Sequence, residues 1–171
     1  AGNDRAIGDD AGISTATNNR YTITVAGVNR LGDIGSGIRP IQRFSEPGAN
    51  ILVSAPASDI TTGSILLSTP GGDQIDDGET NVQGTSFAAP IVSGIVALML
   101  EANPGLTYRD VQAILAISAS KIDPANTEWS DNKSTQIDGK GMHFNRDYGF
   151  GEVDARAAVR LAETWKNLDT A

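Results

Sequence analysis

The 171-residue sequence contains no cysteine, which excludes disulfide bonds and thiol chemistry. Basic residues are also scarce, because 13 Lys and Arg stand against 21 Asp and Glu and leave a net charge of −8. This charge argues against a nucleic-acid partner and suits a protein that binds cations. The longest mainly apolar run, 91–100, is too short to span a bilayer, so no membrane segment is predicted.

The length of the chain suits one domain or a large piece of one, and we expect residues 1–171 to form a single unit. Apolar residues make up 39% of the sequence, which is sufficient for a core. The 19 glycines and seven prolines predict many turns.

Short β-branched segments predict strands. The clearest is 21–26, which is closed by a glycine, and 51–53 is a second short strand. Residues 64–68 are expected to form one strand of a hairpin. The stretch 121–144 is polar and is expected to be irregular, and 148–155 is expected to form a turn and a short strand.

Three helices are predicted. Segment 91–102 is apolar on nearly all faces, which is typical of a fully buried helix. Thr107 and Asp110 have the spacing of a capping box, so a second helix should begin there and run to about Ser118. A third helix, about 155–165, carries apolar residues at helical spacing.

The stretch around which the chain is organised is Gly84-Thr85-Ser86-Phe87-Ala88-Ala89-Pro90, immediately before the apolar helix. Small neighbours let a substrate backbone approach the Ser86 hydroxyl, and the helix start directs free N–H groups and positive potential to the same place. We expect Pro90 to lie in the first turn, where its missing N–H costs little. By helix rules alone, Thr85-Ser86 could equally be an ordinary N-cap.

The string Gly-Thr-Ser-x-Ala-Ala-Pro resembles the nucleophile motif of the subtilisin-like serine proteases. The resemblance runs from Ala1 to about Trp165 and looks closest to kexin and furin-like convertases and their bacterial relatives. It implies an α/β fold, with a parallel sheet flanked by helices, and serine endopeptidase activity on polypeptides. The segments that resemble convertases are Phe44-Ser45-Glu46, 100–103, 106–112, Tyr148-Gly149-Phe150-Gly151 and Asp154-Ala155.

The resemblance assigns Ser86 as the nucleophile and Asn3 as the oxyanion-hole donor. In this family the catalytic order is Asp, His, oxyanion Asn and Ser. The sequence starts at the Asn, so it corresponds to the C-terminal half of a peptidase domain, and the Asp and His are expected from an N-terminal half. His143, the only histidine, follows Ser86 and is expected to be a solvated loop residue.

The resemblance also implies calcium. Asp9 and Glu46 match positions that hold Ca²⁺ near the specificity pocket of convertase-like enzymes, and a third carboxylate would come from the N-terminal half. The alternative is that both are solvated loop acids, the usual fate of Asp and Glu. Convertases carry an acid eleven positions after the oxyanion Asn, but Ser14 stands there and Asp10 is out of register. Cleavage after basic residues is therefore implied by the family alone.

Three alternatives remain open. A sedolisin-like acid peptidase shares a Gly-Thr-Ser-x-x-x-Pro string but has an acid where Asn3 stands. A catalytically inactive subtilisin-like module could serve in binding, and the chain could fold alone as something else. The family further implies a secreted or periplasmic location.

Overall fold

The computed structural model describes residues 1–29, 44–58, 65–76, 82–132 and 141–168. Its centre is a parallel pair of strands, β1 (Thr24–Val28) and β2 (Ile51–Pro56), in which Val25 lies beside Val53 and Gly27 beside Ala55. All five residues of β1 are buried, which agrees with its β-branched and small side chains.

Both strands are confirmed, but β1 begins three residues later than predicted. The side chain of Asn19 accepts a hydrogen bond from the backbone N–H of Tyr21 (3.0 Å), and the Asn19 carbonyl accepts one from Thr22 (3.2 Å). These bonds hold 19–22 as a turn, since Asn side chains compete with strand pairing for backbone donors.

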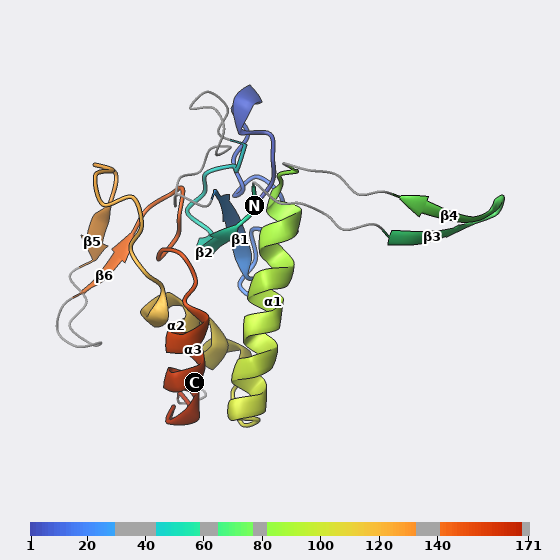
Figure 1. Cartoon of the computed structure of the whole chain (residues 1–171). Coiled ribbons are helices and arrows are strands. Elements are labelled where there is room, and N and C mark those ends of the chain that lie inside the picture. Colours follow the sequence, from blue (N-terminus) through green and yellow to red (C-terminus); the bar gives the residue numbers. More distant parts are fainter. Residues whose placement is uncertain (30–43, 59–64, 77–81, 133–140, 169–171) are drawn as a thin grey trace.

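Three helices pack around this pair (Figure 1). Helix α1 (Thr85–Ala102) contacts β1, β2 and α3 (Ala155–Glu163), while α2 (Tyr108–Ser118) contacts β2 and α3. The result is an α/β arrangement of a parallel pair with helical cover, as predicted. The main core combines buried side chains from these elements, among them Val25, Val53, Val92, Ile95, Met99, Ile114, Leu115 and Ala158.

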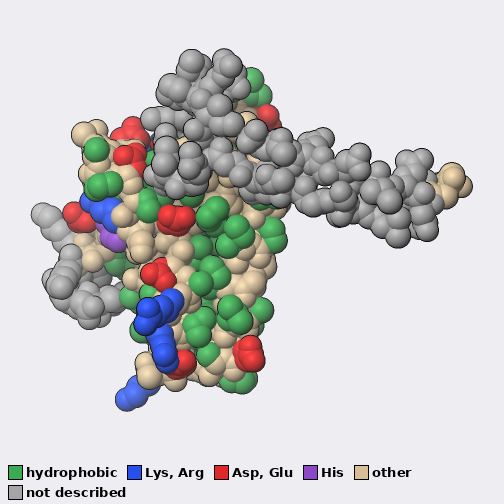
Figure 2. Space-filling view, viewed as in Figure 1, with side chains coloured by type: hydrophobic (Ala, Val, Ile, Leu, Met, Phe, Trp, Pro, Cys, Tyr) green, Lys and Arg blue, Asp and Glu red, His purple; other side chains and the backbone are tan. Residues whose placement is uncertain are grey.

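The prediction that the apolar helix is buried on all sides is wrong for this chain. One face of α1 packs on the sheet and α3, but Ile91 and Leu98 on the rest of the helix are 38% and 50% exposed. Figure 2 shows apolar side chains gathered over this helix. The helix has 18 residues and is apolar enough to cross a membrane, but its contacts with β1, β2 and α3 identify it as the central helix of a folded core.

Pro90 also departs from its expected place. Helix α1 starts at Thr85, so Pro90 is its sixth residue and lies in the second turn. Proline has no N–H, so it cannot donate the helical bond to the carbonyl of Ser86.

The capping box of α2 is confirmed. The Thr107 side chain accepts a hydrogen bond from Asp110 N, and Asp110 in return accepts one from Thr107 N at 2.8 Å. The fully buried Asp110 carboxylate also accepts bonds from Trp165 Nε1 (3.0 Å) and Leu168 N (2.8 Å), which ties α2 to the segment after α3.

Two further strand predictions need correction. Within 121–144, β5 (Ser130–Asn132) pairs antiparallel with β6 (Met142–Phe144). The 148–155 segment forms no strand, and Glu152 instead makes isolated bridges to Ser54 and Ser120. The predicted hairpin is confirmed as β3 (Ile65–Thr69) and β4 (Gly72–Asp76), which project away from the helices (Figure 1).

Candidate active site

Asn3 meets the first turn of α1. The backbone N–H of Thr85 donates to Asn3 Oδ1 at 2.9 Å, and the Gly2 N–H donates to Thr85 Oγ1 at 3.3 Å. The N-cap residue is Gly84, and it makes no side-chain capping bond. The Thr85-Ser86 N-cap reading is therefore wrong, since the acceptor at the helix start comes from a loop 82 residues earlier in the sequence.

This contact orients the Asn3 amide. Because Oδ1 faces Thr85 N, the Nδ2 donors point elsewhere, and a Cβ built on Gly84 would lie 3.5 Å from Asn3 Nδ2. Gly84 has φ +154°, a conformation that L side chains rarely adopt. Glycine thus leaves open space beside the Asn3 amide.

Ser86 is exposed and is the second residue of α1. Because Ser86 lies in the first turn of α1, its backbone N–H has no acceptor one turn earlier within the helix. The site therefore presents one hydroxyl and N–H donors from the helix start and from Asn3. Such donors can stabilise negative charge that develops on a carbonyl oxygen.

Three carboxylates gather beside this loop. One ligand oxygen each from Asp4, Asp9 and Glu46 lies within 4.8 Å of the others. Glu46 is only 6% exposed and accepts a hydrogen bond from Asp4 N at 3.0 Å. Hard carboxylate oxygens from separate loops are the donors that Ca²⁺ takes, so the donor set fits a calcium ion.

The sequence predicted two members of this cluster and missed the third. The carboxylate expected from an N-terminal half stays a prediction, and Asp9 and Glu46 are brought together with Asp4, which the prediction did not name. Its position directly after Asn3, in the loop that carries Asp9, was the available signal.

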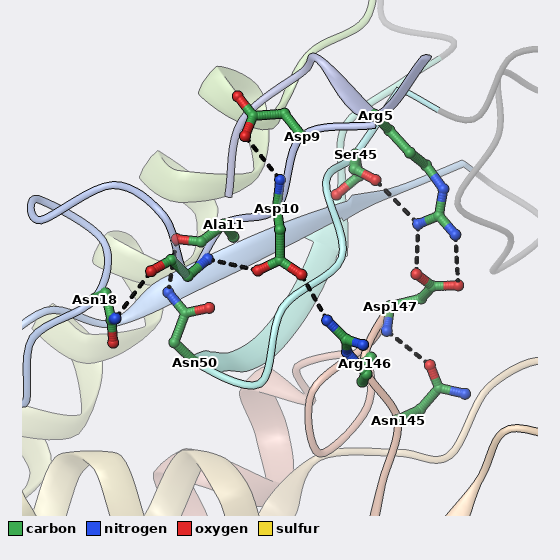
Figure 3. A network of polar contacts seen from close by, with 11 residues as sticks. Arg5, Asp9, Asp10, Ala11, Asn18, Ser45, Asn50, Asn145, Arg146 and Asp147 are labelled. Atoms are coloured by element: carbon green, nitrogen blue, oxygen red, sulfur yellow. Dashed lines mark hydrogen bonds and ion pairs between the residues drawn. The ribbon is translucent and has the colours of Figure 1, made fainter. Parts of the chain in front are cut away.

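The remaining candidates lie elsewhere. Asp10 pairs with Arg146 (2.5 Å) and accepts a bond from Gly12 N, so its carboxylate is engaged (Figure 3). Ser14 is exposed. His143 is not a solvated loop residue, because it lies on β6 with its ring edge-on to Trp129 at 5.2 Å and Nε2 buried.

In Figure 1 the β5–β6 hairpin and the first turn of α1 are well separated. His143 lies on β6 and Ser86 in the first turn of α1, so the two residues belong to separate parts of the fold.

Comparison with known proteins gives a consistent result. The subtilase family model (Peptidase_S8) matches residues 1–151. The chain is 32% identical over 170 residues to Protease KEX1 of Kluyveromyces lactis, covering 99% of this chain and 20% of that protein. It is 36% identical over 165 residues to human proprotein convertase subtilisin/kexin type 6, covering 96% of this chain and 15% of that protein.

Among solved structures, the serine protease of Aeromonas sobria matches with a TM-score of 0.72 and 25% identity, covering 95% of this chain and 32% of that one. The chain thus spans a fifth or less of the curated relatives just described. The family model matches most of the chain, and the fold agrees with it. The chain therefore belongs to the subtilase family of serine peptidases, and within it is similar to the kexins and proprotein convertases.

Proposed function

We propose that this chain carries the nucleophile and part of the oxyanion hole of a serine endopeptidase, with Ser86 as the nucleophile and Asn3 as a donor. The observation that carries the proposal is the 2.9 Å bond from Thr85 N to Asn3 Oδ1. This bond holds the Asn3 side-chain amide against Thr85, the residue directly before Ser86. Membership of the subtilase family supports it.

The chemistry follows from the donors. The Ser86 oxygen adds to the substrate carbonyl carbon while its proton passes to a general base, and the carbonyl electrons move to the oxygen. Asn3 Nδ2 and the Ser86 N–H donate to that oxygen. When the carbonyl re-forms, the C–N bond breaks and the base returns the proton to the leaving amine.

The general base is a histidine outside these 171 residues, together with the Asp that orients it. His143 is the only histidine in the sequence, and it packs on Trp129 in a separate part of the fold from Ser86. A base must come within hydrogen-bond reach of the hydroxyl it deprotonates. We assign both groups to an N-terminal half of the same peptidase domain, with residues 1–171 as the C-terminal part.

The surface that this half would cover lies along α1 and β1. A groove of about 250 Å³ runs between them, lined by apolar side chains and one serine: Ile23, Val25, Ala89, Val92, Ser93 and Val96. The amino group of Ala1 donates to Val25 O at 2.7 Å, so a segment joined to Ala1 would lie next to β1. Parallel strands are normally covered on both faces, so an N-terminal segment in this groove would extend the packing of β1 and α1.

Asp9 and Glu46, joined by Asp4, would hold Ca²⁺, which would neutralise the carboxylates and order the loop after Asn3. By analogy with its relatives, we further propose polypeptide substrates, cleavage after basic residues, and a secreted or periplasmic location. Ser14 and Asp10 provide no separate support for the basic preference.

Two substitutions in the reassembled domain test the catalytic roles. Ser86→Ala should lower kcat by roughly a millionfold with the melting temperature unchanged. Asn3→Ala should lower kcat by roughly 100- to 1000-fold while Ser86 still reacts with a fluorophosphonate. Substantial turnover by a clean Ser86→Ala preparation would overturn the nucleophile assignment.

A further inference from the structure

The guanidinium of Arg5, two residues after Asn3, joins three segments of the chain (Figure 3). Arg5 Nη1 and Nη2 donate to the two carboxylate oxygens of Asp147, the second at 3.2 Å, in a two-point ion pair. Nη1 also donates to the Ser45 carbonyl at 3.3 Å, directly before Glu46. The Asp147 side chain is only 2% exposed, so this ion pair is largely removed from water.

The loop that carries Asn3 is anchored in the core only at its two ends, where Ala1 and the fully buried Ala11 pack with Ala26 and Ile51. Its one regular element, the 3-10 helix Arg5–Ile7, contains no buried residue, and Ile7 is 83% exposed. Between these ends the loop is held by polar contacts. Besides those of Arg5, they include the bonds of Asn3 and Gly2 to Thr85 and the bond from Asp4 N to Glu46. Backbone bonds from Glu46 N to Gly2 O (3.2 Å) and from Arg5 N to Phe44 O (3.4 Å) add to these.

Asp147, by contrast, belongs to a rigid turn. Asn145 and Gly149 exchange two backbone hydrogen bonds of 2.9 and 2.8 Å, and Phe150 N donates to Leu52 O of β2 at 2.8 Å. A Cβ on Gly149 would come within 2.4 Å of the same Leu52 carbonyl, so the turn lies directly against the strand. Asp147 is thus a fixed charge, and Arg5 is the part of the loop that reaches it.

We propose that Arg5 and Asp147 are positioning residues for the reaction, which hold the Asn3 amide at the site where the oxyanion develops. This inference rests on the proposed role of Asn3. A two-point guanidinium–carboxylate pair fixes direction as well as distance. A displacement of about 1 Å in a catalytic group can cost on the order of 100-fold in rate.

The test uses the reassembled peptidase domain, saturated with Ca²⁺ and kept well below its melting temperature. Arg5→Met should lower kcat roughly 10- to 100-fold with KM within about twofold. Asp147→Asn, which keeps the shape of the side chain, should act in the same direction, and Arg5→Lys should recover part of the loss. Arg160→Gln, which removes the exposed Arg160–Glu163 pair on α3, is the control and should change neither constant.

A second measurement separates positioning from stability. Affinity for a peptide boronic acid, whose adduct with Ser86 resembles the tetrahedral intermediate, should fall with kcat, whereas affinity for the product peptide should not. The Thr85 amide, which donates to Asn3, should exchange its hydrogen faster in Asp147→Asn. A lower melting temperature with unchanged kcat and boronate affinity would overturn the proposal.

Double substitution distinguishes this inference from the proposed function. Because Arg5 acts through Asn3, Asn3→Ala with Arg5→Met should be no slower than Asn3→Ala alone, whereas independent roles would multiply. If Asn3→Ala leaves kcat unchanged, the oxyanion assignment itself fails. If Asn3→Ala is slow but Arg5→Met and Asp147→Asn are not, only the positioning role fails.

Discussion

Gly2 lies so close to Glu46 that a Cβ on Gly2 would come within 2.0 Å of the Glu46 carboxylate. The backbone φ of Gly2 is +131°, which L side chains rarely adopt. The residue before the candidate oxyanion donor thus packs directly against a buried acid of the candidate calcium site. The candidate oxyanion hole and the candidate calcium site share one loop, so a substitution in one should alter the properties of the other.

Gly2→Ala tests this contact. We expect it to weaken both turnover and calcium binding, because either the carboxylate or the backbone beside Asn3 must move. The control is Gly72→Ala, since Gly72 also has positive φ (+107°) but a Cβ placed on it would have no atom of the described residues within 4 Å. Backbone strain of about 1–3 kcal/mol applies to both variants. If Gly2→Ala and Gly72→Ala changed kcat and calcium affinity to the same extent, the coupling between the two sites would be contradicted.

The sequence predicted best those features that depend on local contacts. The α2 capping box joins residues only three apart, so the start of this helix was predicted correctly. The start of β1 was missed because the Asn19 turn overrides the β-branched pattern of 21–26. The buried faces of α1 could not be predicted, because composition shows that a helix is apolar but not which neighbours cover it.

The sequence motif predicted which residues form the candidate site, but it could not predict how they are arranged. The order of the motifs indicated Asn3 and Ser86. The bond from Thr85 N to Asn3 Oδ1 joins residues 82 apart, which is beyond any local pattern. Asp147 is 142 residues from Arg5 and has no spacing signal at all. Contacts of this range are decided by how the loops fold onto β1 and β2.

Calcium binding should depend on individual carboxylates. Asp9→Asn or Glu46→Gln removes a charged ligand, so the rise in melting temperature with added Ca²⁺ should shift to higher concentrations. Asp131→Asn, on the exposed strand β5, is the matched control. Asp4→Asn decides whether the third carboxylate of the cluster is a ligand. Identical calcium titrations for wild type, Asp9→Asn and Glu46→Gln would reject the site.

Asp110 should make stability dependent on acid pH. Burial of the carboxylate raises its pKa, but hydrogen bonds from Leu168 N, Thr107 and Trp165 outweigh this and lower it to about 2. A lowered pKa stabilises the fold above the unfolded-state pKa of about 3.9, and this contribution is lost as pH falls from about 5 toward 2.

Asp110→Asn should therefore lower the melting temperature by several degrees at pH 7 and by much less near pH 2.5. Asp131→Asn, on the exposed strand β5, is again the control. A pH-independent decrease would show that Asp110 acts through shape alone.

Residues 1–171 expressed alone should be inactive and loosely packed. The motivating observation is the exposed face of α1, where burying the remaining 38% of Ile91 and 50% of Leu98 would contribute roughly 0.6–1.5 kcal/mol each. A typical domain is stable by only about 5–15 kcal/mol, so this loss is large. Adding a polypeptide that carries the Asp and His segments should restore a sharp melting transition and peptide hydrolysis together. Size-exclusion elution, thermal unfolding and a peptidase assay measure the three properties.

Ile91→Gln with Leu98→Gln should reduce aggregation of the isolated chain but prevent reassembly, whereas Tyr108→Gln, an exposed residue of α2, should do neither. A monodisperse, cooperatively melting and active monomer would overturn the two-part assignment, because the base would then have to lie within these 171 residues.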